Sequence, residues 1–223
     1  MYLFIKRVFD ILFSSIVLII VFPIFLPVMI LLRLTGEGKI FYIQQRVGKG
    51  MKPFGLIKFA TMLENSSNMA GGDITTGDDP RVLKVGKFLR KTKLNEFPQF
   101  INILKGDMSV VGPRPTTFRN YSYYSESIQS LIKGLKPGLT GIGSIVFRDE
   151  ESFIKDSKKD AVSFYKDDIA PYKGELELWY SKHRGILTDF LIIFTTAYVV
   201  IFPKSEIVHD LFKDLPKHNL FKK

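Results

Sequence analysis

The chain has 223 residues, enough for one domain with a substantial hydrophobic core and a short appendage. It contains no cysteine, which excludes a disulfide framework and a cysteine-based metal site. The formal net charge of +10 favours contact with an anionic partner, although a solvated basic surface explains the charge as well. Because 20 phenylalanines suit a membrane-associated protein and no nucleic-acid-binding motif is present, we expect no nucleic acid partner.

An apolar segment near the N-terminus, residues 11–32, is long enough to cross the hydrocarbon core of a bilayer. It is too long for a cleaved signal peptide, and no small-residue cleavage site follows it. Pro23 and Pro27 lack a backbone N–H and clash with the preceding turn, which predicts a kink near the middle. A straight spanning helix and a kinked helix that enters and leaves by the same leaflet both fit the residues.

Charged residues flank this segment on both sides. Lys6 and Arg7 precede it and Arg33 follows it, so positive charge lies at both ends and gives no clear orientation by the positive-inside rule. Lys6 and Arg7 lie one helical turn before Asp10, and we expect these residues to pair their charges at the membrane interface.

The remaining chain predicts an α/β fold that is mostly helical with a small sheet. We divide the whole chain into an anchoring segment (1–34), a folded domain (35–203) and a basic tail (204–223). In the domain, strands are predicted at 40–47 and 54–59, a loop at 64–79 and helices at 82–89, 97–104, 121–133 and 160–180, the last with a break near Pro171. Asp78 and Asp79, before Pro80, are predicted to cap the helix that carries Arg81. The apolar run 189–202 is too short to span and fits a buried or interfacial helix.

Several blocks, in order, resemble the bacterial sugar transferase family, the monotopic phosphoglycosyl transferases. One block alone is weak evidence, but their order over most of the chain to about residue 147 makes the resemblance specific. The blocks are KRVFD (6–10), QRVG (45–48), KPF (52–54), KF (58–59), GDDPR (77–81), VGKFLRKT (85–92), LNEFPQ (94–99), LKGDMS (104–109), GPRP (112–115) and PGLTG (137–141).

In that family a re-entrant helix anchors the protein in the inner leaflet, and the active site lies at the cytoplasmic surface. The resemblance therefore implies a Pro23-kinked re-entrant helix, a cytoplasmic catalytic domain with amphipathic interfacial helices, and contact with membrane lipids. The implied location is the cytoplasmic face of the bacterial inner membrane, with a monotopic topology. One departure is that Phe22 precedes Pro23 where the family usually has Ser-Pro.

The resemblance also implies a chemistry from which this chain departs. Family members use an Asp-Glu pair, in which Asp attacks the β-phosphate of a nucleotide-sugar donor and Glu helps to hold Mg²⁺. Here the pair is Asn95-Glu96, which leaves Glu96 as the implied metal ligand, and a neutral amide is a poor nucleophile. Ala60 also replaces an arginine of the family pattern that would be a natural phosphate partner.

Three explanations of Asn95 compete: an engineered change, an inactive relative, or a different reaction. Ala60 argues against a single engineered change, and the retained blocks argue against an inactive relative. We favour, slightly, direct transfer of a sugar from a nucleotide diphosphate sugar, a UDP-sugar, to a polyprenyl-linked acceptor such as a polyprenyl diphosphate-sugar in glycan assembly. The alternative is phospho-sugar transfer to polyprenyl phosphate, and a non-catalytic membrane scaffold is a third hypothesis.

Direct transfer needs a general base and a stabilised leaving group. Glu96 is the first candidate, because it occupies the active-site position that the resemblance implies. Glu150, in the acidic run 149–151, is the second, although acids at the first turn of a helix more commonly serve its dipole.

Basic residues are the candidates for binding the donor phosphates. Arg114 lies between Pro113 and Pro115, whose stiff backbone suits a guanidinium that grips a diphosphate. Lys58 and Arg81 are further candidate phosphate contacts, although a lone basic residue usually lies on the surface.

Overall fold

A computed structural model describes residues 1–69, 75, 79–202, 205 and 207–218. The chain is mostly helical, with two small two-stranded sheets, and begins with a long apolar helix, as predicted. Parts of the predicted loop 64–79 and of the basic tail 204–223 lie outside the described residues.

The elements follow one another along the chain as α1 (Tyr2–Leu34), β1 (Phe41–Val47), η1 (Lys49–Met51), β2 (Pro53–Phe59), η2 (Ser66–Asn68), α2 (Lys84–Lys91), η3 (Leu94–Glu96), α3 (Gln99–Lys105) and β3 (Ser109–Val111). The second half has α4 (Phe118–Tyr121), α5 (Glu126–Lys133), β4 (Gly138–Thr140), α6 (Ile142–Val146), α7 (Glu150–Asp156), α8 (Ala161–Phe164), the π-helical turn η4 (Tyr165–Ile169), α9 (Ala170–His183), α10 (Ile186–Ile201) and α11 (Ile207–Leu211).

Three local expectations differ from the structure. The helix predicted over 121–133 is interrupted, because Ser125 caps α5 by accepting from the Ile128 N–H. The break predicted near Pro171 lies upstream, in η4, since a proline in the first turn of α9 loses no helical hydrogen bond. Asp79 does not begin a helix; α2 starts at Lys84.

The N-terminal half of α1 is fastened to the domain by its charged residues. Arg7 donates to two backbone carbonyls of α3 at 2.6 and 2.7 Å. Asp10 is only 2% exposed and accepts from the Val110 N–H at 2.8 Å, and Lys6 forms an ion pair with Asp189 on α10. The expectation that these charges pair with one another at the interface is therefore wrong, because buried polar groups of the domain satisfy them instead.

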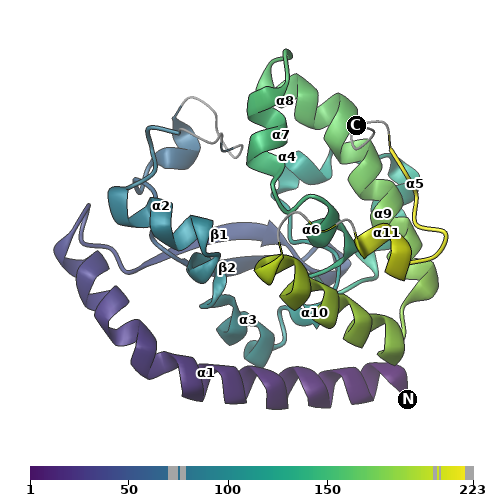
Figure 1. Ribbon diagram of the computed structural model, residues 1–223, viewed down its shortest axis with the longest axis horizontal. Coiled ribbons are helices and arrows are strands. Elements are labelled where there is room, and N and C mark those ends of the chain that lie inside the picture. The colour runs from purple at the N-terminus through teal and green to yellow at the C-terminus, as the bar shows by residue number, and fades with distance from the viewer. Residues whose placement is uncertain (70–74, 76–78, 203–204, 206, 219–223) are drawn as a thin grey trace.

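The C-terminal half of α1 packs on the same domain through apolar contacts. Phe25 and Leu32 are buried in one cluster with Phe59 and Leu89, and the ring centroids of Phe25 and Phe59 lie 5.1 Å apart. Pro23 lies inside the helix and is exposed. Figure 1 shows α1 running beneath the other elements and bending toward its C-terminal end. The domain therefore contacts both halves of α1.

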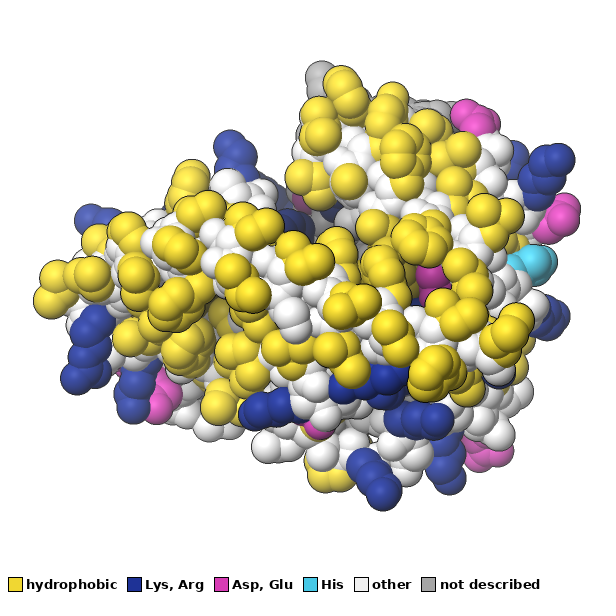
Figure 2. Space-filling model, turned by 90° about the horizontal axis from the view of Figure 1, so that it is seen from below, with side chains coloured by type: hydrophobic (Ala, Val, Ile, Leu, Met, Phe, Trp, Pro, Cys, Tyr) yellow, Lys and Arg dark blue, Asp and Glu magenta, His cyan; other side chains and the backbone are white. Residues whose placement is uncertain are grey.

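The opposite side of α1 and the outer side of α10 form one exposed apolar face (Figure 2), with basic side chains gathered along one border. Water-soluble monomers rarely expose so many large apolar side chains together. Those on α1 include Leu12, Ile16, Ile19, Ile20, Phe22, Ile24, Leu26, Ile30 and Leu31, and those on α10 include Leu187, Phe190, Phe194, Val200 and Ile201.

Two pairs of strands position the loops discussed below. β1 and β2 pair antiparallel, with Phe41 opposite Phe59, and the amide of Asn102 binds the backbone of β2 at Gly55 and Ile57. β3 and β4 pair in parallel, and the backbone of β3 continues into Gly112, where a side chain would meet the Lys136 carbonyl at 2.4 Å. This close approach holds the segment after β3 in one position.

The main hydrophobic core lies between α9 and the elements that surround it. Tyr172 and Leu176 of α9 are fully buried there. In the described part of the expected basic tail, Val208, Phe212 and Leu215 are buried in the same core. Apolar contacts thus tie residues 208–215 to the domain.

Candidate functional site

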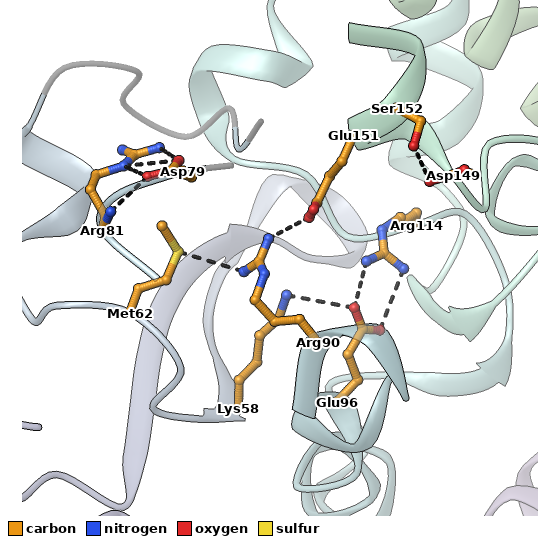
Figure 3. A network of polar contacts seen from close by, with 10 residues as sticks. All are labelled: Lys58, Met62, Asp79, Arg81, Arg90, Glu96, Arg114, Asp149, Glu151 and Ser152. Atoms are coloured by element: carbon orange, nitrogen blue, oxygen red, sulfur yellow. Dashed lines mark hydrogen bonds and ion pairs between the residues drawn. The ribbon is translucent and has the colours of Figure 1, made fainter. Parts of the chain in front are cut away.

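An ion-pair cluster centred on Glu96 lies where η3, β2 and the segment after β3 meet (Figure 3). The Glu96 side chain is 14% exposed and accepts from the Arg114 guanidinium at 2.7 and 3.5 Å. The Lys58 Nζ lies 3.9 Å from the same carboxylate. The structure therefore brings together three of the residues that the sequence predicted, and the Arg114 side chain, 38% exposed, is the most accessible of the three.

Backbone contacts fix Arg114 in this cluster. Both flanking prolines are buried: the Pro113 carbonyl accepts from the Gly138 N–H at 2.8 Å, and the Pro115 carbonyl accepts from the Arg46 guanidinium at 3.4 Å. The two prolines thus position the arginine through their carbonyl oxygens and their restricted backbone.

Burial and neighbouring charges shift the pKa values of all three groups. Burial alone would raise the pKa of Glu96, but Arg114, Lys58 and Lys93 hold it well below its usual value. The pKa of Arg114 is raised above its usual value, mainly by the Glu96 charge. Burial lowers the pKa of Lys58 to about 7, and the charges of Arg46 and Arg114 add to this effect against that of Glu96. Glu96 is thus a fixed anion, whereas Lys58 titrates near neutrality.

A second group of ion pairs surrounds the cluster. Arg90 of α2 pairs with Glu151 and contacts the Met62 sulfur. Glu150 pairs with Lys173 of α9, whose Nζ lies 5.0 Å from the centre of the Tyr165 ring. Glu150 therefore has a cationic partner of its own and is not part of the Glu96 cluster. The Arg90 and Lys173 pairs were not predicted, since nothing in the sequence indicates which acid each cation meets.

Arg81 does not join the cluster. Its side chain is 3% exposed and binds the Asp79 carboxylate, with a further hydrogen bond of 2.7 Å to the Ser66 carbonyl. Figure 3 shows this pair apart from Glu96. A buried guanidinium needs a paired acid, and Asp79 is that acid. Through its hydrogen bond to Ser66, Arg81 also holds the 79–81 turn against the preceding loop.

Asn95 is 5% exposed, and within the described residues its Oδ1 has no hydrogen-bond partner. Ala60, the other departure, is also 5% exposed, and its N–H donates to the Ile40 carbonyl. The buried side chains at these two positions thus provide neither the carboxylate nor the guanidinium that the resemblance implies.

The described residues do not form a magnesium site by themselves. Among them no group of three or more His, Asp or Glu side chains could hold a metal ion. Glu96 is already engaged by two cations, and its neighbour Asn95 offers one amide oxygen. Mg²⁺ usually keeps several waters and shares the oxygens of substrate phosphates with one or two carboxylates. Glu96 is the residue that would hold it here, and we assign no step to a metal.

One buried carboxyl was not predicted. Glu177 of α9 is 4% exposed, its Oε2 has no partner in the described part of the chain, and a side chain on Gly143 would meet its Oε1 at 2.8 Å. Burial raises the pKa of Glu177 to about 7, against the opposing effects of the Arg114 backbone and Lys173. No motif in the sequence singles out Glu177.

Curated relatives share the sequence over most of this chain. It is 37% identical over 205 residues to the UDP-glucose:undecaprenyl-phosphate glucose-1-phosphate transferase of Klebsiella pneumoniae, an alignment of 90% of this chain and 41% of that protein. It is 33% identical over 202 residues to the UDP-N-acetylgalactosamine-undecaprenyl-phosphate N-acetylgalactosaminephosphotransferase of Aeromonas hydrophila, covering 90% of this chain and 44% of that protein.

A third relative is closer in length: the exopolysaccharide production protein ExoY of Sinorhizobium fredii is 35% identical over 209 residues, covering 87% of this chain and 84% of that protein. The chain thus spans less than half of the first two relatives and most of the third. The family model described as bacterial sugar transferase matches residues 1–203. The resemblance seen in the sequence is confirmed: this chain belongs to the bacterial sugar transferase family.

Proposed function

We propose that this sugar transferase moves a phospho-sugar from a UDP-sugar to polyprenyl phosphate, releasing UMP. The sequence slightly favoured direct glycosyl transfer, but two relatives have names that describe phospho-sugar transfer to undecaprenyl phosphate, which supports the alternative. The ion pairs of Glu96 with Arg114 and Lys58 support it too, and they are the observation that carries the proposal.

A sugar hydroxyl needs a general base before it can attack a donor. A base works best when its pKa lies near the working pH, and the Arg114 and Lys58 charges hold the pKa of Glu96 far below that range. A polyprenyl phosphate is already an anion and needs no proton removed. The Glu96 cluster therefore suits a phosphate nucleophile better than a hydroxyl.

In the proposed step, an oxygen of the acceptor phosphate attacks the β-phosphorus of the donor and forms the new P–O bond. The bond from that phosphorus to the bridging oxygen breaks, and UMP leaves with the electron pair. Arg114 and Lys58 stabilise the charge on the phosphoryl oxygens, and Glu96 keeps both cations in place. Since the acceptor is itself the nucleophile, this route needs no carboxylate at Asn95.

Direct glycosyl transfer is the second candidate, and two observations favour it. Asn95 lacks the carboxylate of the covalent route, and Glu177 has a pKa of about 7, the value a general base needs.

The released nucleotide distinguishes the two reactions. Purified protein is incubated with a UDP-sugar labelled in the sugar and with either polyprenyl phosphate or a polyprenyl diphosphate-sugar. We expect UMP and a polyprenyl diphosphate-sugar from the first acceptor. Release of UDP, with the sugar joined to the second acceptor, would overturn the proposal in favour of direct transfer. Absence of turnover with both acceptors would support the scaffold hypothesis.

We further propose that α1 and α10 lie in one leaflet on the cytoplasmic side of the membrane. The domain packs on both halves of α1, so a helix that spanned the bilayer would carry polar parts of the domain into hydrocarbon. A kinked, re-entrant α1 avoids this cost and places the exposed apolar face of α1 and α10 toward lipid.

Donor binding should weaken as Lys58 loses its proton. Because the pKa of Lys58 is about 7, we expect kcat/KM for the UDP-sugar to fall as pH rises above 7. In a Lys58→Arg variant the guanidinium stays charged, so the decline should move to higher pH. Rate profiles from pH 6 to 9 measure both, and identical profiles for the two proteins would contradict the assignment.

Removing the buried acid at Glu177 should stabilise the protein at high pH. Its pKa is about 7 when folded and about 4.5 when unfolded, so ionisation favours unfolding as pH rises from 4.5 to 7, with a constant penalty above. We expect Glu177→Gln to gain up to about 3 kcal/mol at pH 8 and little at pH 4.5.

Thermal unfolding at both pH values measures this gain, with Glu175→Gln as the exposed control on the same helix. Under phospho-sugar transfer, Glu177→Gln keeps its activity. Loss of UDP-releasing activity in this variant would instead identify Glu177 as the base of direct transfer.

A further inference from the structure

A cavity of about 160 Å³ lies at the N-terminal end of α1. Five basic side chains line it, from α1, η1, the loop before β4 and the end of α9: Lys6, Arg7, Lys49, Lys136 and Arg184. Asp10, the acid in its wall, is engaged by the Val110 N–H and the Ser109 hydroxyl. None of the residues of the Glu96 cluster lines this cavity.

Protein groups balance only part of the positive charge of the cavity, and Asp10 is the one acid among the described residues that line it. Lys6 is neutralised by Asp189, but in the described ranges of the chain Lys49, Lys136 and Arg184 form no ion pair. Arg7 and Lys136 converge on Gly106, where a Cβ would lie 3.4 Å from an Arg7 nitrogen and 4.0 Å from the Lys136 Nζ.

Burial lowers the pKa of Lys136, and the charges of Arg7 and Lys49 lower it further against the opposing effects of Asp10 and Asp107. A concave site that gathers several cations with so little compensation favours an anion.

An apolar notch between α1 and α10 adjoins this cavity. The notch shares Tyr2, Lys6, Asp10 and Val111 with the basic cavity. Its other walls include the apolar Ile5, Phe9 and Phe190, and Asp189, whose charge is paired with Lys6. The side chains of Ile5 and Phe190 also belong to the exposed apolar surface. A ligand with a charged head and an apolar tail fits this arrangement, whereas a free phosphate would use only the basic half.

We propose that this cavity binds the phosphate of an anionic phospholipid, with the start of an acyl chain in the notch between α1 and α10. The bound lipid would complete the fastening of α1 to the domain, since Arg7 and Lys6 already hold the helix to α3 and α10 at this end. The inference uses the membrane contact of the proposed function but not its reaction.

The test uses the full chain in detergent and short-chain phosphatidylglycerol as the probe. A ligand that binds only the folded state raises the unfolding temperature as its concentration rises. We expect phosphatidylglycerol to stabilise the protein and phosphatidylcholine to do so far less. A Lys49→Gln/Lys136→Gln variant should lose most of the difference between the two lipids.

Matched controls separate this site from general charge and from catalysis. Lys158→Gln/Lys166→Gln removes the same charge from exposed positions near α7 and α8, across the molecule from α1 in Figure 1, and should keep the lipid effect. Glu96→Gln should lose sugar transfer but keep the lipid effect, so failure of the proposed reaction leaves this test intact.

Three results would overturn the proposal. These are equal stabilisation by the two lipids, an undiminished difference in the Lys49→Gln/Lys136→Gln variant, or the full effect with inorganic phosphate alone. The last result would assign the cavity to a soluble phosphate instead of a lipid.

Discussion

Replacement of Glu96 by glutamine is expected to lower kcat for sugar transfer by at least about 100-fold, a loss typical of removing one preorganised electrostatic group. Glu96 fixes two cations, with Arg114 at 2.7 Å and Lys58 at 3.9 Å. A neutral amide keeps the size of the side chain but no longer orients the guanidinium and the ammonium. In the variant, Arg114 and Lys58 bind the donor phosphates in the ground state. They are no longer held in the orientation that stabilises the phosphoryl oxygens in the transition state.

This reasoning predicts that kcat and KM respond differently. The donor's own phosphates supply the negative charge that Glu96 gave up, so we expect the KM of Glu96→Gln for the UDP-sugar to stay equal or fall. Initial rates over a range of donor concentrations measure both quantities. Glu175→Gln, at an exposed position of α9, is the matched control and should keep the wild-type kcat.

A Glu96→Gln variant with unchanged kcat and unchanged KM would remove Glu96 from the site. A variant with unchanged kcat but a much higher KM would make Glu96 a determinant of donor binding only. Unfolding temperatures of the variant and the wild type show whether a lost rate reflects the site or the fold.

The sequence could predict the parts of this site that depend on rigid local structure. Lys58 is a basic residue retained in one of the blocks, within a predicted strand, and Arg114 lies in a Pro-Arg-Pro segment with a stiff backbone. Glu96 was predicted as a site residue from its position in the ordered blocks that resemble the family. These three residues meet in the structure because β2, η3 and the segment after β3 converge.

The remaining assignments depended on partners far along the chain or on burial, which residue types do not reveal. Arg81 looked like a phosphate contact, but Asp79 occupies it within a buried turn. Lys6 and Arg7 looked like interfacial charges paired with Asp10, but their partners lie on α10 and α3. Glu177 was not predicted at all, because its burial depends on α6, where Gly143 lies against its carboxylate.

Replacement of Asn95 by aspartate restores the Asp-Glu pair of the family and should therefore restore a nucleophile at this position. Asn95 is buried beside Glu96, and its Oδ1 has no partner among the described residues. A carboxylate there would lie beside a cluster that already contains Arg114 and Lys58, whose charges offset its repulsion from Glu96. It would be able to attack the β-phosphorus of the donor and release UMP before the acceptor binds.

We expect Asn95→Asp to transfer phospho-sugar about 100-fold faster than the wild type, equivalent to about 2.7 kcal/mol of barrier. Intact-protein mass spectrometry without acceptor should show the added mass of one phospho-sugar on the variant and none on the wild type. Asn95→Ala, which removes the unpartnered amide without adding a nucleophile, should form no adduct and keep the wild-type rate within a few fold.

The adduct and the rate test different parts of the argument. A variant that forms the adduct without gaining rate would mean that the second displacement, by the acceptor phosphate, is limiting in this site. An adduct on the wild-type protein would contradict the single-displacement route, because a covalent phospho-sugar would then form although Asn95 offers no carboxylate. If Asn95→Asp neither forms an adduct nor gains rate, position 95 does not face the donor phosphorus, and the released nucleotide, UMP or UDP, still decides between single displacement and direct transfer.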